Sequence, residues 1–222
     1  MTISENPRIT DVLLFEKGEE VNFVRETITL AAGGAAVVIG QVLGGMRLGG
    51  VGSVTETHVG NTGNGVFTPD GATPSLVNAP VGVYTVTFLT ATHYRVFDPL
   101  GREIGEGDTG VVFADLLKFS IAAGGAAFVA GDKFLVTVGA GSGKYAAVAA
   151  AAADGTQVAT AVAIEAGNPA VGDVQIVAVV RAPAIFKVSG LVWPAGITAP
   201  QKAVAIAQLA ALGMTVRSDY GF

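Results

Sequence analysis

The chain has 222 residues, of which 50% are hydrophobic and only 14% are charged, with 31 glycines and a formal net charge of -5. This length suffices for one large domain or two small ones. The surface of a free soluble domain is usually about a quarter charged or more. The low charge content of this chain therefore indicates that partners cover much of its surface. The chain has no cysteine and no cluster of Lys and Arg. Disulfides and thiolate zinc sites are therefore excluded, folding in a reducing cytoplasm is favoured, and nucleic-acid binding through phosphates is not expected.

Residues 1–25 form a predicted arm that is polar and charged except for one apolar run. That run consists of Val12, Leu13, Leu14 and Phe15. An exposed apolar tetrad in a polar arm is a candidate docking peptide, which can add a strand to a partner's sheet. The alternative is that the tetrad folds back onto its own domain. Residues 1–11 include acidic residues and lack the apolar core of a secretory signal.

Residues 27–46 are uncharged over a length that could cross a membrane as a helix. Five glycines in this run, together with Thr27, Thr29 and Gln41, argue against a membrane helix. Two short strands around an Ala-Gly turn explain the composition better. We therefore expect strand, turn and strand between Glu26 and Arg47, and no membrane-spanning segment.

The pattern changes between Gly49 and Gly141, where strands alternate and no convincing helix occurs. A loop-rich start carries strong Gly-Asn and Pro-Asp-Gly turn signals up to Pro80. The clearest strand runs that follow are residues 84–88, 94–97, 102–104, 117–121 and 134–138. We interpret this segment as an inserted β-domain of five or six strands, a small sandwich.

An Ala-Ala-Gly-Gly-Ala-Ala sequence follows an alternating strand twice, within residues 29–40 and 120–131. Two interpretations stay open: a duplicated hairpin, or the chance recurrence of Ala/Gly-rich turns in a Gly-rich chain.

After Lys144 the sequence predicts a return to short β-elements. An Ala-rich run, residues 146–153, ends at an Asp-Gly turn. Strand candidates follow at residues 158–164, 174–180 and 184–188.

The clearest helix of the chain is predicted near its end. Thr198 is a suitable N-cap, and Gln201 three residues later completes a capping box. Pro200 falls in the first turn, and Gly213 can take the left-handed position after the last turn. The helix between these signals is apolar almost all round, which indicates burial on more than one side. The second side can be another subunit.

Three blocks of the chain resemble, in the same order, the lambda-like bacteriophage head decoration proteins. They are residues 27–44, residues 144–165, and residues 191–217, in which a Trp-Pro pair precedes the short helix and a final strand at 214–217. The resemblance implies a small core that forms a homotrimer at local threefold positions of a phage head. It also implies that the N-terminal arm lies against the capsid shell. Compact family members lack a segment equivalent to residues 49–141, which marks it as an insertion.

Trp193, the only tryptophan, lies beside Pro194 just before the helix. A core aromatic and a subunit contact are both consistent with this position, and tryptophan is favoured at contacts because it buries a large area. Together with Ile206 and Leu209 of the helix, the pair is our predicted packing element of the trimeric core.

No sequence motif predicts catalysis or a cofactor. Residues 139–144 look like a phosphate loop, but Val138 and Tyr145 stand where that motif needs Gly and Ser or Thr. A flexible junction is the better interpretation. Two histidines and no cysteine leave little from which to assemble a catalytic triad.

Metal sites are not predicted either. The only histidines, His58 and His93, have no acidic neighbour at ligand spacing along the chain. We interpret Glu103, Glu106 and Asp108, which cluster among glycines, as a solvated turn rather than a calcium site.

The sequence thus predicts a mainly β protein with one short C-terminal helix. We expect an N-terminal arm at 1–25, a decoration-protein core at 26–47 and 144–222, and a sandwich-like inserted domain at 48–143. The expected function is that of a non-enzymatic virion protein, made in the host cytoplasm, which binds the major capsid protein as a homotrimer and stabilises the expanded head. The alternative is an adhesion or carbohydrate-binding module whose insert binds a host-surface or glycan ligand.

Overall fold

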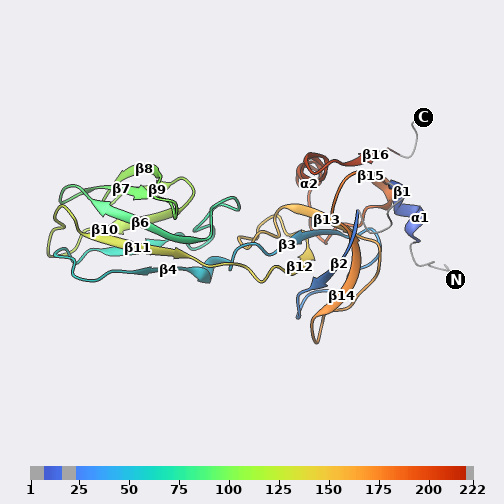
Figure 1. Ribbon diagram of the computed structural model, residues 1–222, viewed down its shortest axis with the longest axis horizontal. Coiled ribbons are helices and arrows are strands. Elements are labelled where there is room, and N and C mark those ends of the chain that lie inside the picture. Colours follow the sequence, from blue (N-terminus) through green and yellow to red (C-terminus); the bar gives the residue numbers. More distant parts are fainter. Residues whose placement is uncertain (1–7, 17–23, 219–222) are drawn as a thin grey trace. The chain divides into compact units, whose positions relative to one another are not determined.

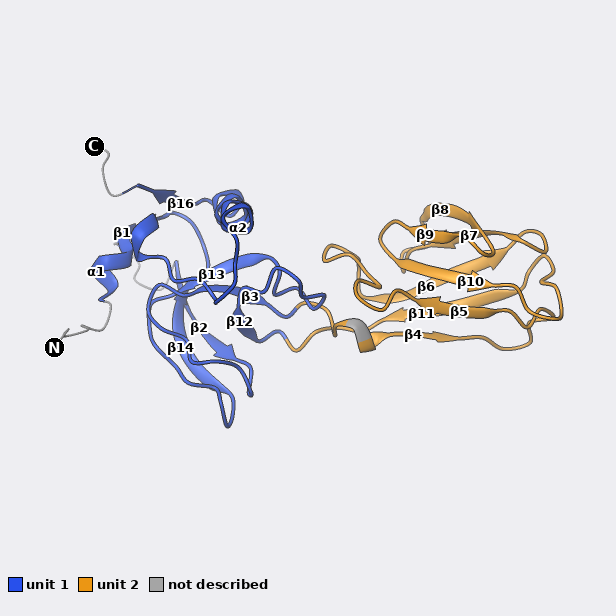
Figure 2. Cartoon of the chain, turned by 180° about the vertical axis from the view of Figure 1, so that it is seen from behind, with its two compact units in different colours: residues 1–46, 143–222 blue, residues 47–142 orange. Residues whose placement is uncertain are grey.

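The chain divides into two compact units in the computed structural model, which describes residues 8–16 and 24–218. Unit 1 comprises residues 1–46 and 143–222, and unit 2 comprises residues 47–142 (Figure 2). The insertion predicted from the sequence, 48–143, differs from unit 2 by one residue at each end.

Unit 1 is built on a closed five-stranded barrel (Figure 1). Its strands, in the order in which they pair around the barrel, are β12 Tyr145–Ala147, β2 Arg25–Leu30, β14 Val174–Val179, β13 Ala159–Ala163 and β3 Val42–Gly45. Only the pair β12 and β2 is parallel. Strands β2 and β3 are the two predicted on either side of the Ala-Gly turn, and no described helix is long and apolar enough to cross a membrane.

Alanines and larger aliphatic side chains together fill one core of the barrel. Ala161, Ala163 and Ala178 are fully buried there beside Ile28 and Ile176. Few strands leave a narrow interior, which small residues fit. Strand β13 is buried along its whole length because the intervening residues, such as Val162, belong to a second cluster on its other face.

A second layer covers that other face. It contains α1 Ile9–Val12, β1 Leu13–Glu16, β15 Ala184–Lys187, the 3-10 turn η2 Val188–Gly190, α2 Ala199–Ala211 and β16 Met214–Arg217. The three strands form a small sheet in the order β1-β15-β16. Their core includes Val12, Phe186, Leu209 and Met214, all fully buried.

Helix α2 starts and ends where the sequence predicts. The Thr198 side chain accepts from the Gln201 N–H, and the Gln201 side chain in turn accepts from the Thr198 N–H, which completes the capping box. Gly213 has a φ of +78° just after the helix, a conformation that favours glycine. The predicted final strand is confirmed as β16.

Unit 2 is a two-layered β-structure around a single aromatic core. A five-stranded sheet contains, in order, β4 Val54–Thr57, β11 Lys133–Val138, β6 Gly82–Phe88, β7 His93–Phe97 and β8 Glu103–Asp108. A three-stranded sheet contains β5 Val66–Pro69, β10 Lys118–Ala122 and β9 Val112–Ala114. A 3-10 turn, η1 Val51–Ser53, precedes β4. Phe67 and Phe119 of the smaller sheet stack with centroids 4.6 Å apart, and Phe67 packs against Phe134 of the larger.

Strands β4, β5 and β9 were not predicted from the sequence. The insert therefore has eight strands, where five or six were expected. The loop before β5 lies beside the loop that joins β10 to β11, because Asn64 and Ala126 are hydrogen-bonded. There the buried Asp132 accepts hydrogen bonds from the backbone of Thr62 and Gly63, and Gly63 and Gly65 pack on the ring of Phe128. The glycine- and asparagine-rich stretch is therefore an ordered, packed loop.

The repeated Ala-Ala-Gly-Gly-Ala-Ala segments do not form hairpins. The first joins β2 to β3, which are separated by β12 in the barrel, and the second joins β10 to β11, which lie in different sheets. The interpretation as a duplicated hairpin is therefore wrong, because each segment crosses between strands that do not pair with each other.

Candidate functional site

Among the described residues, no group of three or more His, Asp or Glu side chains is placed so that it could hold a metal ion. Lys144, at the end of the phosphate-loop look-alike, forms an ion pair of 2.6 Å with Asp173. The described residues also present exposed apolar side chains, among them Leu14, Phe15 and Val204.

The apolar tetrad of the N-terminal segment is divided between core and surface. Val12 is fully buried, and Leu13 packs partly against the same cluster. Leu14 and Phe15 remain 49% and 51% exposed on β1. Among the described residues, strand β1 pairs with β15 on one side only, so it forms an edge of that sheet. The docking hypothesis is thereby narrowed to Leu14, Phe15 and this edge; the parts of the arm at residues 1–7 and 17–23 lie outside the described residues.

An ion pair fixes the end of β1 to the barrel. Glu16 accepts two hydrogen bonds from the guanidinium of Arg25, at the first position of β2. This contact raises the pKa of Arg25. The exposed side chains of β1 therefore lie on a strand that is held at both ends, by the buried Val12 before it and by the ion pair of Glu16 with Arg25 at its end.

The predicted packing element also has members in different environments. Leu209 is fully buried, and Ile206 is partly buried against the same core. Trp193 is half-buried against that core, with the Lys202 ammonium 6.0 Å from its ring centroid. Pro194 lines a surface hollow beside the start of α2.

The described residues leave one apolar side of helix α2 uncovered. Val204 is 56% exposed, and Ala203, Ala207, Ala210 and Ala211 are exposed around it. An adjoining hollow of about 360 Å³ separates this side from the Ala-rich segment after β12. Its lining includes Val148, Ala150, Ile197, Pro200 and Val204. Among the residues that the structure describes, α2 is thus buried on one side, and the prediction that another subunit covers its second side stays a prediction.

The inward side of α2 is held by a polar contact as well as by packing. The Gln208 side chain accepts a hydrogen bond of 2.8 Å from the Ala159 N–H at the start of β13. This bond fixes the rotation of the helix, so that its uncovered side has a defined direction.

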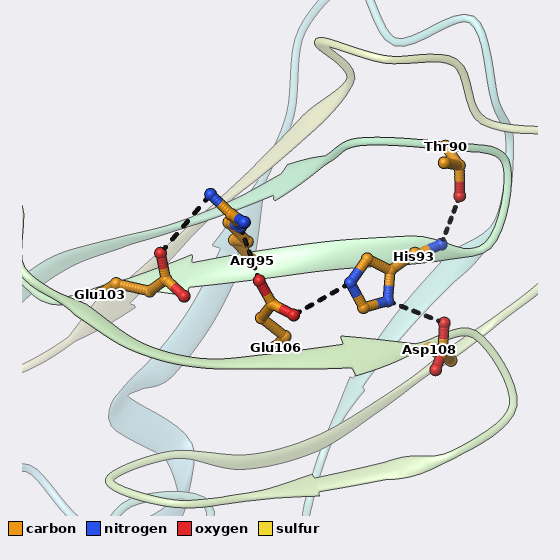
Figure 3. Close-up of polar contacts among 6 residues, drawn as sticks. All are labelled: Thr90, His93, Arg95, Glu103, Glu106 and Asp108. Carbon is orange, nitrogen blue, oxygen red and sulfur yellow. Dashed lines mark hydrogen bonds and ion pairs between the residues drawn. The ribbon is translucent and has the colours of Figure 1, made fainter.

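Unit 2 carries a ladder of charged side chains across β7 and β8 (Figure 3). The two ring nitrogens of His93 lie 3.0 Å from Asp108 and 3.3 Å from Glu106. Arg95 donates to Glu106 at 2.7 Å and reaches Glu103 at 3.8 Å. The interpretation of these carboxylates as a solvated turn is wrong, because Glu103–Asp108 is a paired strand.

The ladder shifts the titration of its members. The hydrogen bond that Asp108 accepts from the His93 ring, supported by the one that Glu106 accepts, raises the pKa of His93. The hydrogen bond from Arg95, followed by that from His93, lowers the pKa of Glu106. The sequence contains a signal for this ladder, because charged residues alternate with others along each strand: His93 and Arg95 are two residues apart, as are Glu106 and Asp108. Strand pairing brings together what sequence spacing keeps apart.

Comparison with known proteins gives one extensive match. A family model described as bacteriophage lambda head decoration protein D matches residues 2–214. Two crystal structures of Xanthomonas campestris FlgL are similar to parts of the chain. One is 28% identical, covers 43% of this chain and 32% of that chain, and has a TM-score of 0.32. The other is 27% identical, covers 48% and 33%, and has a TM-score of 0.31. The chain thus spans about a third of the length of these FlgL chains. No curated protein matches it.

Proposed function

The chain belongs to the family of bacteriophage lambda head decoration protein D, and we propose that it binds the outside of a phage capsid as a homotrimer and stabilises the expanded head. The observation that carries this proposal is the family match over residues 2–214. The role is structural: the family is one of capsid decoration, and the candidate features of the described residues are surfaces. The major capsid protein is the proposed partner and the virion surface the proposed location.

The uncovered side of α2 supports a homotrimer. Exposed Val204 and its neighbouring alanines offer an apolar surface of small side chains, which allows close approach of another chain. Removing such surface from water is favourable by about 25 cal/mol per Å², and this gain is offset in part by the freedom that the associating chains lose. Trp193 and Pro194, beside the same helix, extend the proposed contact.

The edge of β1 supports docking to the capsid. An extended capsid segment could add a strand beside Leu14 and Phe15, with main-chain hydrogen bonds providing affinity and the two exposed side chains providing specificity. If the complementary site exists only in the expanded shell, binding stabilises that shell by mass action.

Capsid binding is tested by sedimentation with expanded heads that lack decoration. The wild-type protein should sediment with the heads. The double variant Leu14→Asp/Phe15→Asp should stay in the supernatant, because charges replace the exposed docking side chains. Val171→Asp is the matched control, since Val171 is fully exposed elsewhere in unit 1. Failure of the wild-type protein to bind the heads would overturn the proposal.

The trimer is tested by light scattering, alone and on dissolved decorated heads. Val204→Asp should reduce the trimer to monomers while the chain stays folded, because it places a charge in the proposed contact. Trp193→Ala should weaken the trimer or the fold more than substitutions in unit 2 do. A wild-type protein that is monomeric in both settings, or a Val204→Asp trimer as stable as that of wild type, would contradict the model of the contact.

A further inference from the structure

The outward face of the β1-β15-β16 sheet combines apolar side chains with two cations. The three strands lie side by side (Figure 1), and pairing places Phe15 of β1 opposite Ile185 of β15 and Ile185 beside Thr215 of β16. The next row on this face contains Lys187 and Arg217, because residues two apart on a strand point to the same side. We call these five residues the outer sheet face. The other face of the sheet packs on the core of unit 1, so the outer sheet face is the one that a partner can reach.

The two cations of the outer sheet face are direct neighbours. Lys187 and Arg217 are Cα partners in the parallel pair of β15 and β16. Neighbouring strands lie about 4.8 Å apart, so the two side chains leave the sheet close together. Like charges placed opposite each other destabilise a sheet. An anion bound to both side chains would remove this repulsion.

Described carboxylates do not neutralise this pair of cations. Other described cations form ion pairs, namely Arg25, Arg95, Arg102, Lys118, Lys144 and Arg181. Among the described residues, neither Lys187 nor Arg217 has such a partner. Elements α1 and β1, which pack against β15, each carry one carboxylate, and both are in use: Asp11 accepts from the Arg8 N–H, and Glu16 is paired with Arg25. The charge of the pair is therefore left for a partner.

The two cations lie beyond the reach of a strand added at the edge of β1. Such a strand would lie about 10 Å from β15 and about 14 Å from β16, given the spacing of about 4.8 Å between neighbours. Lys187 and Arg217 would therefore face a different part of the capsid surface from the one that pairs with β1. Phe15 in the adjoining row is 51% exposed, so the same surface also offers an apolar contact.

We propose that the outer sheet face docks on an acidic patch of the major capsid protein, whose carboxylates pair with Lys187 and Arg217 while an apolar group covers Phe15 and Ile185. Residues two apart on a strand are separated by about 7 Å, so the apolar group would lie at about that distance from the carboxylates. This inference rests on the proposed capsid binding and adds the chemistry of the capsid surface.

The net charge of the chain gives the cation pair a second role. The whole chain carries a formal net charge of -5, so an acidic patch repels it at long range. Lys187 and Arg217 make the outer sheet face an exception to this repulsion. Charge complementarity of this kind selects the orientation in which two surfaces meet.

The test is sedimentation of the full-length protein with undecorated expanded heads at two salt concentrations. Lys187→Gln/Arg217→Gln should bind about tenfold more weakly than wild type at about 0.05 M salt. The difference should shrink at about 0.5 M salt, where screening shortens the range of the charges. Arg47→Gln/Lys133→Gln is the matched control, because it removes two exposed cations from unit 2, and it should bind as wild type does. Circular dichroism checks that both variants are folded.

A second measurement tests the charge of the partner. Amidation of the exposed carboxylates of the heads with a carbodiimide and glycinamide should weaken binding of the wild-type protein. The same treatment should leave binding of Lys187→Gln/Arg217→Gln unchanged. The exchanged variant Lys187→Arg/Arg217→Lys keeps both charges and should bind untreated heads as wild type does.

The outcomes separate this inference from the proposed function. If wild type sediments with the heads and Lys187→Gln/Arg217→Gln binds equally well at both salt concentrations, the acidic patch is overturned and capsid binding stands. Wild-type binding that amidation leaves unchanged would also overturn the patch, and would assign the outer sheet face to another occupant, such as a second copy of the chain. Failure of wild type to bind the heads at either salt concentration would overturn the proposed function itself.

Discussion

Two buried tyrosines of unit 2 differ in whether the hydroxyl has a partner. Tyr84 donates to the Pro80 carbonyl at 2.9 Å, whereas Tyr94 has no partner among the described residues. Burial raises the pKa of each to about 12, so both stay neutral at physiological pH. Any difference in their contribution to stability therefore comes from the hydrogen bond.

We expect Tyr84→Phe to lower the free energy of unfolding of the unliganded protein by about 1 kcal/mol, because it removes a made hydrogen bond. Tyr94→Phe should not lower the free energy of unfolding, because the substitution removes a buried hydroxyl whose desolvation no hydrogen bond offsets. Urea denaturation of the two variants checks this pair. An equal loss in both would mean that the Tyr94 hydroxyl is paired in solution.

Gly213 is the residue on which the end of α2 depends. Its φ of +78° disfavours any side chain, and a Cβ would lie 2.5 Å from the Ala182 Cβ. Gly196, also in unit 1, has a φ of +80° but open space around it. Gly196→Ala should cost about 1 to 2 kcal/mol for the backbone conformation alone. Gly213→Ala should cost about 1 to 3 kcal/mol more, because it also overpacks the site. Thermal unfolding that ranks the two variants equally would count against this account.

At the scale of the element, the charged ladder of β7 and β8 gives the hairpin a pH optimum. The pKa of His93 is raised, so its contribution is complete below the usual value of 6.5 and is lost as the pH rises through the raised value. The pKa of Glu106 is lowered, so its contribution is complete above the usual value of 4.5 and is lost as the pH falls through the lowered value. The ladder therefore stabilises the hairpin most between about pH 4.5 and 6.5.

The matching prediction compares wild type with His93→Gln. The variant should melt at a lower temperature than wild type at pH 5.5, and the difference should shrink as the pH rises through the raised pKa of His93. Because the ladder is exposed, the effect is small. Asp108→Asn serves as a check on the cause, since it should return the pKa of His93, followed by NMR, towards 6.5. A melting difference that does not depend on pH would contradict the ladder's role.

The elements that the sequence predicted correctly carry their signals locally. Thr198, Gln201 and Gly213 define α2 by capping chemistry, and the alternation around Tyr84 defines β6. What the sequence could not predict depends on partners distant along the chain. Strand β9 has three residues and exists because it pairs with β10, and the contacts of His93 exist because β7 pairs with β8. The exposed side of α2 was likewise invisible, since an apolar sequence does not tell which face the chain itself covers.

At the scale of the whole molecule, each unit has its own core. The aromatic cluster of unit 2 contains only residues of that unit, and the two clusters of unit 1 only residues of unit 1. A domain with its own core can fold alone. The two chain crossings between the units also lie together, because the Met46 N–H donates to the Lys144 carbonyl and the Gly143 N–H donates to the Met46 carbonyl.

These two features predict that unit 2 can be removed and replaced by a short glycine linker between Met46 and Gly143. The hydrogen bonds of Met46 already hold the two ends side by side, so the linker closes a small gap and the barrel strands β3 and β12 keep their pairing. The shortened protein should unfold cooperatively and should still sediment with expanded heads, while residues 47–142 expressed alone should fold and should not sediment. Circular dichroism and the head-binding assay measure both. An unfolded core would mean that the barrel depends on the insert, and head binding by the isolated insert would move the capsid contact to unit 2.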